Sequence, residues 1–331
     1  MRVGMCFPYE VESSAGLDLA RAADAQGLDS IWVVENAYWP GAFATAGALA
    51  AVTERLTIGI GVVSPFTRSP AVIAMEAAQV QQLSRGRLVF GLGASTPEVL
   101  ADMGIPASGL FGGMSEALEL MPRLFGDGVD SFKGTRFELT NIRLSFSVTP
   151  PPIVVGSVGA KMLALAGERA DGIIISTHCP TSFIEQCIIT AREGATIAGR
   201  DADGLSVTAF VVTALDRDAA EARRALKPSL AWAIARFAGK PSLERILVSA
   251  GIDLDHIQSI SEGFREGRDP SRLVDDWIVD ALCVAGDADV LAERLETLRA
   301  IGVNEVVLFD APNAPGFVDF IPTVVAAASA I

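Results

Sequence analysis

Runs of apolar residues, rich in valine and isoleucine, alternate along this chain with segments in which apolar positions recur every three or four residues. The first pattern is typical of buried strands and the second of amphipathic helices. Strands are predicted at residues 3–7, 30–34, 56–63, 87–92, 153–155, 172–176, 206–214 and 305–309. Helices are predicted at residues 17–26, 41–53, 71–84, 160–169 and 288–301. Gly27 is expected to end the first helix, because glycine readily adopts the left-handed conformation found there.

The predicted strands are mostly continuous apolar runs, which indicates a parallel sheet covered by helices. Eight strand–helix units favour a closed α/β barrel, the (β/α)8 TIM fold; the alternative, an open doubly wound sheet, suits six or seven strands better. We therefore predict one TIM-barrel domain over residues 1–331. Residues 96–150, after strand four, form one predicted insertion with a helix and an irregular segment, and residues 227–286, between strands seven and eight, form a second, helix-rich one. Long insertions are typical of lids and interfaces.

Composition narrows the class of protein. Half of the 331 residues are hydrophobic and the net charge is −14, without a basic stripe, so we expect no nucleic-acid partner. No apolar run reaches the length of a membrane span, and Met1 and Arg2 lead straight into a strand without a signal peptide. The four cysteines form no CxxC pair, and His178 beside Cys179 lacks metal-ligand spacing. We expect a cytoplasmic protein that binds no metal and no membrane.

In such barrels the chemistry lies in the loops at the carboxyl ends of the strands. The loop after strand five, residues 156–161, is the best candidate for an anion site. Gly156, Ser157 and Gly159 leave backbone N–H groups at the start of a helix, and Lys161 adds positive charge. The alternative is that the glycines only let this helix pack close to the sheet. A Rossmann motif is incomplete, since Thr96 stands where a third glycine would follow Gly91 and Gly93.

The loops after strands one to three supply further candidates. Glu35 can accept a hydrogen bond from a ring N–H or exchange a proton with a cofactor; otherwise it is a charge at the rim, paired with an arginine. Arg68 either holds an anionic tail or caps a loop. The aromatic side chains near these loops either wall a pocket or belong to the core. They are Tyr38, Trp39 and Phe66.

Four strings of residues resemble the bacterial luciferase-like flavin and deazaflavin oxidoreductases. They are GLDSIWV at 27–33, IGIGVVSPFTRSP at 58–70, SRGR at 84–87 leading into GLGA at 91–94, and GSVGAKML at 156–163 with ADG at 170–172. The second string is especially similar to the methylenetetrahydromethanopterin reductase branch. The resemblance covers strands one to six, and the last third of the chain only by architecture. Together the strings are fairly specific, whereas each alone is weak.

The resemblance implies a barrel with coenzyme F420, a deazaflavin, or alternatively FMN at the carboxyl mouth. It implies a non-proline cis peptide between Gly61 and Val62, bulging against the rear face of the ring, and a phosphate-bearing tail held at residues 156–160. Glu35 matches a position that commonly carries aspartate beside the polar edge of the ring. The cofactor-binding residues so implied are Glu35, Gly61, Val62, Ser64, Gly93, Ser95, Gly156, Ser157, Val158, Gly159, Ala160 and Lys161.

The sequence departs from the family at the end of strand two. Family members often carry an Asp-His pair there, and the sugar-phosphate dehydrogenases use that histidine as a base; here the pair is Glu35 and Asn36. Asparagine takes no proton at neutral pH, whereas reduction of a C=C, C=N or C=O bond by hydride transfer needs no such base. Glu35 or Tyr9 then completes protonation. Glu35, Tyr9 and Asn36 are therefore the catalytic candidates, on a small or medium organic substrate.

Two other functions remain open from the sequence. One is an FMN-dependent monooxygenase of the same fold, which uses O₂ and a partner flavin reductase. The other is a non-catalytic protein that binds a flavin or deazaflavin. We also expect a homodimer, because barrels of this family commonly pair through helices two and three, and the apolar stretch 42–52 is compatible with that pairing.

Overall fold

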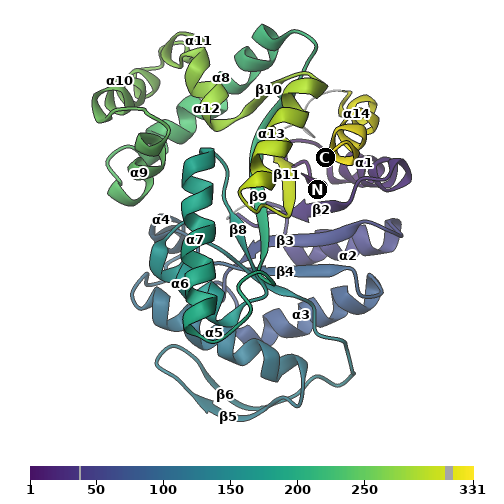
Figure 1. Ribbon diagram of the computed structural model, residues 1–331. Coiled ribbons are helices and arrows are strands. Elements are labelled where there is room, and N and C mark those ends of the chain that lie inside the picture. The colour runs from purple at the N-terminus through teal and green to yellow at the C-terminus, as the bar shows by residue number, and fades with distance from the viewer. Residues whose placement is uncertain (37–38, 310–315) are drawn as a thin grey trace.

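Eight parallel strands close into a barrel in the computed structural model, which describes residues 1–36, 39–309 and 316–331 (Figure 1). The sheet runs in the order β10-β9-β11-β1-β2-β3-β4-β7-β8, and β9 pairs with β8 as well as with β11, which closes the barrel. The barrel strands are β1 (Arg2–Cys6), β2 (Ser30–Val33), β3 (Thr57–Val63), β4 (Leu88–Leu92), β7 (Ile153–Gly156), β8 (Gly172–Ile175), β9 (Ser206–Leu215) and β11 (Glu305–Phe309). The TIM-barrel prediction is confirmed, and the open-sheet alternative is wrong.

Helices cover the outside of the barrel, as the continuous apolar strands require. They are α1 (Ser13–Gln26), α2 (Ala42–Val52), α3 (Pro70–Leu83), α5 (Leu110–Phe125), α6 (Ala160–Arg169), α7 (Thr181–Ile197), α13 (Ala288–Ala300) and α14 (Phe317–Ser329). Gly27 ends α1 with φ of 86°, as predicted. The helix begins at Ser13 rather than at residue 17, because its first turn is polar and small and carries no apolar signal. None of the helices in the described residues is long and apolar enough to cross a membrane.

The first insertion is smaller than predicted. Helix α5 packs against α3 and α6 as part of the barrel wall, so only α4 (Pro97–Asp102) and a hairpin of β5 (Val129–Lys133) and β6 (Glu138–Ile142) are additional. The hairpin was not predicted, whereas residues 143–152, between β6 and β7, form no helix or strand and are the irregular segment that was predicted. The carboxylate of Glu116 in α5 accepts hydrogen bonds from the backbone N–H groups of Thr135, Arg136 and Phe137 at 2.6–3.0 Å, which fixes the hairpin turn. Because Glu116 lies in α5, the sequence of the hairpin itself carries no pattern that would have predicted this interaction.

The second insertion is a helical bundle that follows the carboxyl end of β9 and returns to the sheet at β10 (Figure 1). It comprises α8 (Ala219–Phe237), α9 (Pro241–Ser249), α10 (Leu254–Arg265), α11 (Pro270–Leu273), α12 (Asp276–Leu282) and the short strand β10 (Val284–Gly286). Its apolar core is separate from that of the barrel and includes Leu230, Ile257 and Ile278. Strand β10, which was not predicted, extends the sheet beside the last residues of β9.

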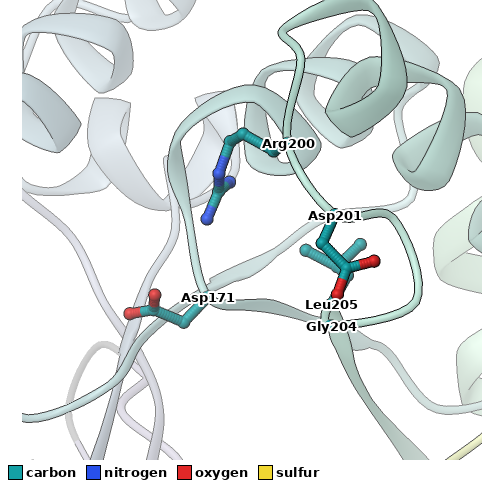
Figure 2. Close-up of a pocket in the computed structure, with 5 residues that line it drawn as sticks. All are labelled: Asp171, Arg200, Asp201, Gly204 and Leu205. Carbon is teal, nitrogen blue, oxygen red and sulfur yellow. The ribbon is translucent and has the colours of Figure 1, made fainter.

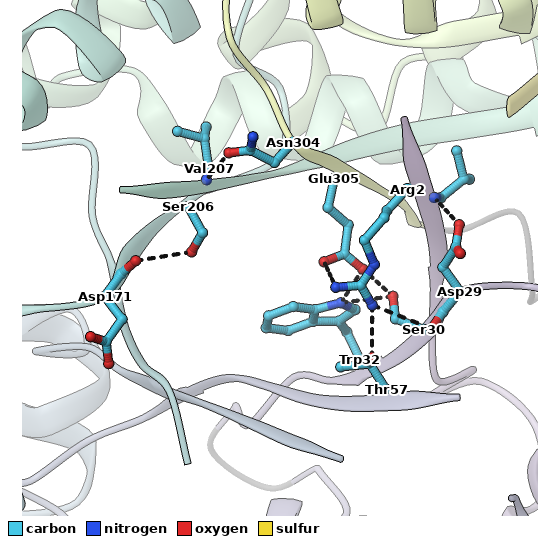
Figure 3. A network of polar contacts seen from close by, with 11 residues as sticks. Arg2, Asp29, Ser30, Trp32, Thr57, Asp171, Ser206, Val207, Asn304 and Glu305 are labelled. Carbon is cyan, nitrogen blue, oxygen red and sulfur yellow. Dashed lines mark hydrogen bonds and ion pairs between the residues drawn. The ribbon is translucent and has the colours of Figure 1, made fainter. Parts of the chain in front are cut away.

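A buried polar network ties together the amino ends of β1, β2 and β11 (Figure 3). The Glu305 carboxylate, 5% exposed, accepts hydrogen bonds from the Ser30 hydroxyl and, at 3.2 Å, from Trp32 Nε1. Arg2 Nη1 lies 3.8 Å from Glu305 Oε2 and so partly balances its charge. Because a buried carboxylate is stable only when it is paired and hydrogen-bonded, this network fixes the register at the base of the barrel.

Candidate active site

The end of β3 bulges into the barrel mouth at Val62. The peptide bond between Gly61 and Val62 is cis, as the resemblance implied, and the pairing of β3 with β4 shifts register between Ile60 and Val63. The methyl groups of Val62 fill space that three neighbouring glycines leave open. A Cβ atom at Gly93 would lie 2.3 Å from one methyl carbon, and Cβ atoms at Gly91 and Gly156 would lie 2.9 and 2.7 Å from the other. These glycines therefore shape the surface between β3, β4 and β7.

The loop from β7 to α6 presents backbone N–H groups at the mouth. Gly159 and Ala160 are exposed, and α6 begins without a side-chain cap and without an acidic residue in its first turn. The Ser157 hydroxyl accepts a hydrogen bond from the Gly159 N–H at 3.0 Å, which shapes the loop. Because the first N–H groups of a helix lack partners within it and lie at its positive end, this loop is suited to bind an anion. Lys161 is exposed beside it.

Glu35 is paired with an arginine. Arg68 Nη1 lies 2.8 Å from Oε1 and 3.0 Å from Oε2 of Glu35, and Oε2 also accepts a hydrogen bond from the Ala42 N–H at 3.3 Å. Arg68 also lies 3.6 Å from Glu76 and over the Phe43 ring. Glu35 is thus paired with an arginine, and its role toward a cofactor ring stays a prediction. Arg68 is engaged by protein groups, so its alternative as holder of an anionic tail is not supported.

Aromatic rings line the mouth beside β1 and β2. Tyr9 stacks on Trp39 with ring centroids 4.2 Å apart, and Phe309 lies 5.7 Å from Tyr9. Tyr9 and Trp39 border a small pocket together with Phe7 and Val34. In the loop after β2, the backbone carbonyl of Asn36 accepts a hydrogen bond from the backbone N–H of Trp39 at 3.1 Å. The predicted aromatic wall is thus present for Trp39, joined by Tyr9.

One other aromatic candidate does not add to this wall. Phe66 is buried against Phe137 of the hairpin and under the guanidinium of Arg136, so of the two alternatives it belongs to the core. It turns outward because Gly113 in α5 leaves space that its ring fills. Tyr38 lies outside the described residues.

Ser64 and Ser95 shape the loops after β3 and β4. The buried Ser64 hydroxyl lies 3.5 Å from the Ala94 carbonyl, as a hydrogen-bond donor, and accepts a hydrogen bond from the Phe66 N–H at 3.3 Å. Ser95 is exposed and has a positive φ of 65°, a conformation that serine rarely adopts. Ser64 therefore links the two loops from inside, whereas Ser95 faces solvent.

His178 follows β8 and is buried at the same end of the barrel. Its Nε2 atom has no hydrogen-bond partner, and burial lowers the pKa of the ring to about 4, so the imidazole is neutral at physiological pH. Across the described ranges, no group of three or more His, Cys, Asp or Glu side chains is placed to hold a metal ion.

Arg245 reaches the mouth from the second insertion and was not among the predicted residues. Its Nη2 atom donates a hydrogen bond to the Val158 carbonyl, 2.5 Å away, in the loop between β7 and α6. It lies 87 positions from its partner in the sequence, in a segment without a recognisable motif. Only the packing of α9 onto the barrel brings it there.

A cavity with a volume of about 370 Å³ lies at the opposite end of the barrel (Figure 2). It is lined by Asp171, which precedes β8, and by Arg200, Asp201, Gly204 and Leu205, which precede β9. Arg200 donates to the Gly167 and Ala170 carbonyls at 2.6 and 2.7 Å, and Asp171 accepts from the Ile153 N–H at 2.7 Å. Arg200 and Asp171 thus form hydrogen bonds with backbone groups of the barrel. Residues at the amino end of a TIM barrel contribute to stability rather than to catalysis. The candidate site is therefore the carboxyl mouth.

Known proteins resemble the chain in sequence over most of its length. The chain is 29% identical over 290 residues to a 5,10-methylenetetrahydromethanopterin reductase of Methanolobus tindarius, covering 87% of each chain. It is 25% identical over 308 residues to an F420-dependent glucose-6-phosphate dehydrogenase of Amycolatopsis mediterranei, covering 88% of this chain and 86% of that one.

Solved structures and family models agree with these similarities. The coenzyme F420 dependent tetrahydromethanopterin reductase of Methanopyrus kandleri superposes with a TM-score of 0.87 at 24% identity, covering 98% of this chain and 96% of that one. At that identity it supports the fold alone. The model of the luciferase-like monooxygenase family matches residues 1–305. The chain therefore belongs to the luciferase-like monooxygenase family.

Proposed function

We propose that this protein is an F420-dependent oxidoreductase that transfers hydride between the deazaflavin and a small or medium organic substrate with a C=C, C=N or C=O bond. The observation that carries the proposal is the surface at Val62 next to the open start of α6. The notch of Gly91, Gly93 and Gly156 accommodates the Val62 bulge, and the uncapped first turn of α6 offers N–H donors at one side of it. This arrangement fits a planar ring with a phosphate-bearing tail.

The relatives favour F420 over other planar cofactors, since those with glucose-6-phosphate dehydrogenase activity are named as F420-dependent. When bound, a reduced deazaflavin supplies a hydride and, unlike a reduced flavin, does not react with O₂. The protein's own groups would then orient the ring: Val62 behind it, Gly93 and Ser95 along the β4 side, and the β7–α6 loop at the tail. Residues 156–161, with Ser64 supporting the loop beneath, complete this cofactor-binding set.

Titration of the purified protein with F420 and with FMN, followed by tryptophan fluorescence, tests the cofactor. We expect a dissociation constant in the micromolar range or below for F420 and much weaker binding of FMN. Preference for FMN, with oxygen consumption coupled to a substrate, would instead support the monooxygenase alternative that the family description favours. Tight binding of F420 without turnover of any reducible substrate would support a non-catalytic binding protein.

Tyr9 is proposed as the group that completes protonation of the reduced substrate. Its ring lies at the mouth, whereas both Glu35 oxygens are engaged by Arg68 and the amide of Asn36 is not an acid at neutral pH. Glu35 and Asn36 therefore position the ring edge and the substrate. We expect Tyr9→Phe, which keeps the stack on Trp39, to lower kcat by about 10²-fold.

The measurement for this variant is steady-state kinetics with a reducible substrate, together with F420 titration. The dissociation constant of F420 should stay within twofold, since the aromatic ring is retained. An unchanged kcat would remove Tyr9 from the chemistry and leave protonation to solvent.

A homodimer is part of the proposal, formed through α2 and α3. Val72 and Met75 on α3 are 41% and 51% exposed, which is unusual for large apolar side chains on one face of a helix. Sedimentation equilibrium should give twice the mass of 34.7 kDa. A monomer mass at micromolar concentration would refute this part of the proposal.

A further inference from the structure

We propose that Arg245, from the second insertion, is an additional cofactor-binding residue whose guanidinium neutralises the phosphate bound at the start of α6. The inference rests on the proposed function, because it concerns the tail of the same cofactor. It assigns part of the binding site to a helix that the barrel itself does not contain. Three features of the structure support it: the docking of α9, the orientation of Arg245 and the charge at the β7–α6 loop.

Helix α9 is anchored on the barrel rather than on the rest of the insertion alone. Ile246 is 1% exposed and lies in the barrel core, while its neighbour Leu247 lies in the core of the insertion. The Ser182 hydroxyl at the start of α7 donates to the Ser249 carbonyl at 3.3 Å. Lys240, which precedes α9, forms an ion pair with Glu98 of α4 at 2.9 Å. In Figure 1, α9 is accordingly the part of the insertion closest to α4 and α7.

The side chain of Arg245 is held in place although it is exposed. Its Nη2 atom donates to the Val158 carbonyl at 2.5 Å, and the guanidinium lies over the Phe183 ring, 5.3 Å from the centroid. A contact with a ring face and a hydrogen bond together fix the plane of a guanidinium. The positive charge therefore lies against the loop that carries Val158 and Gly159, instead of sampling solvent.

The position of Arg245 matters because the β7–α6 loop carries little positive charge of its own. The chain carries a net charge of −14, so an anionic phosphate approaches a molecule that on average repels it. The start of α6 contributes only partial positive charge, and Lys161 is a single flexible cation. A guanidinium offers planar N–H groups that match phosphate oxygens, and such charge-assisted hydrogen bonds are about twice as strong as neutral ones. Arg245 thus supplies the fixed charge that the loop lacks.

The test compares ligands with and without the anionic tail of the cofactor, which begins with the phosphate. F420 and its deazariboflavin fragment, which ends at the ribityl chain, are titrated into the wild-type protein and into Arg245→Gln, Arg245→Lys and the control Arg272→Gln. Arg272 lies in α11 of the same insertion, and its side chain is 87% exposed. The control thus removes one positive charge from the insertion without touching the loop. Thermal unfolding of each variant checks that it is folded.

We expect Arg245→Gln to raise the dissociation constant of F420 by about 10- to 100-fold and to leave that of the fragment within twofold. Arg245→Lys should retain most of the affinity because it keeps the charge, and Arg272→Gln should behave as wild type. The salt dependence of F420 binding should also become shallower in Arg245→Gln, since one ionic contact is lost.

Three results would overturn the inference. Equal losses for F420 and the fragment would mean that Arg245 acts only by ordering the loop. Equal losses in the Gln and Lys variants would assign the effect to the Val158 hydrogen bond rather than to charge, and unchanged binding would remove Arg245 from the site. If wild-type protein binds neither F420 nor its fragment but takes FMN, the proposed cofactor fails separately, and FMN with riboflavin provides the same comparison for Arg245. Binding of none of the four ligands would refute both proposals.

Discussion

Replacing Gly93 by alanine is expected to weaken F420 binding at least tenfold while the protein remains folded. The new Cβ atom would lie 2.3 Å from a methyl carbon of Val62 and 3.3 Å from its Cβ, so the Val62 side chain must move. Valine is stiff about χ1, and its other methyl group already occupies the space over Gly91 and Gly156. The surface proposed to support the cofactor ring would therefore change shape, whereas the loss of folding stability should be about 1–3 kcal/mol.

The matched control is Gly47→Ala in α2, where an added Cβ atom meets no other atom within 4 Å. It makes the same chemical change away from the mouth, and it should bind F420 as wild type and be slightly more stable. F420 titration and thermal unfolding of both variants provide the measurement. Wild-type affinity in Gly93→Ala would show that the cofactor does not rest on Val62.

The barrel was predictable because its signals are local and repeated. Apolar runs of three or more residues mark all eight barrel strands, helical periodicity predicted α1, α2, α3, α6 and α13, and Gly27 indicated where α1 ends. The position of Val62 was predictable for a different reason, since it depended on a string shared with a known family. Neither argument needed knowledge of a contact between distant residues.

The residues that sequence reasoning misplaced or missed all depend on distant contacts. Phe66 is aromatic, as a pocket wall requires, but the space at Gly113 in α5 decides which way its ring points. The hairpin after α5 is held by Glu116, and Arg245 reaches Val158 only because α9 packs on the barrel. Glu35 allowed two interpretations that differ by one partner, and its pairing with Arg68 becomes visible only in the fold. The sequence thus shows which side chains are available near the mouth, but not which way each of them points.

Replacing Glu305 by alanine is expected to lower the free energy of unfolding by about 2–4 kcal/mol, the sum of a small cavity and of polar groups left without their acceptor. The Trp32 Nε1–H would retain only the Ser30 oxygen, 3.1 Å away, and the Ser30 hydroxyl would lose its carboxylate acceptor. Arg2 would keep its 2.7 Å hydrogen bond to Thr57 but lose its buried counter-charge. Glu305→Gln, which keeps the shape and one acceptor oxygen, should cost about half as much.

Urea denaturation of both variants measures the loss of folding stability. F420 titration shows whether the substitutions also affect the candidate site. We expect the dissociation constant of F420 to stay within twofold, because Glu305 lies at the amino end of the barrel and the candidate site lies at the carboxyl end. A loss of stability below 1 kcal/mol in Glu305→Ala would mean that the network is dispensable. A large loss of affinity at unchanged stability would mean that the two ends of the barrel are coupled through β2 and β11, and the division between a stabilising base and a reactive mouth would not hold for this protein.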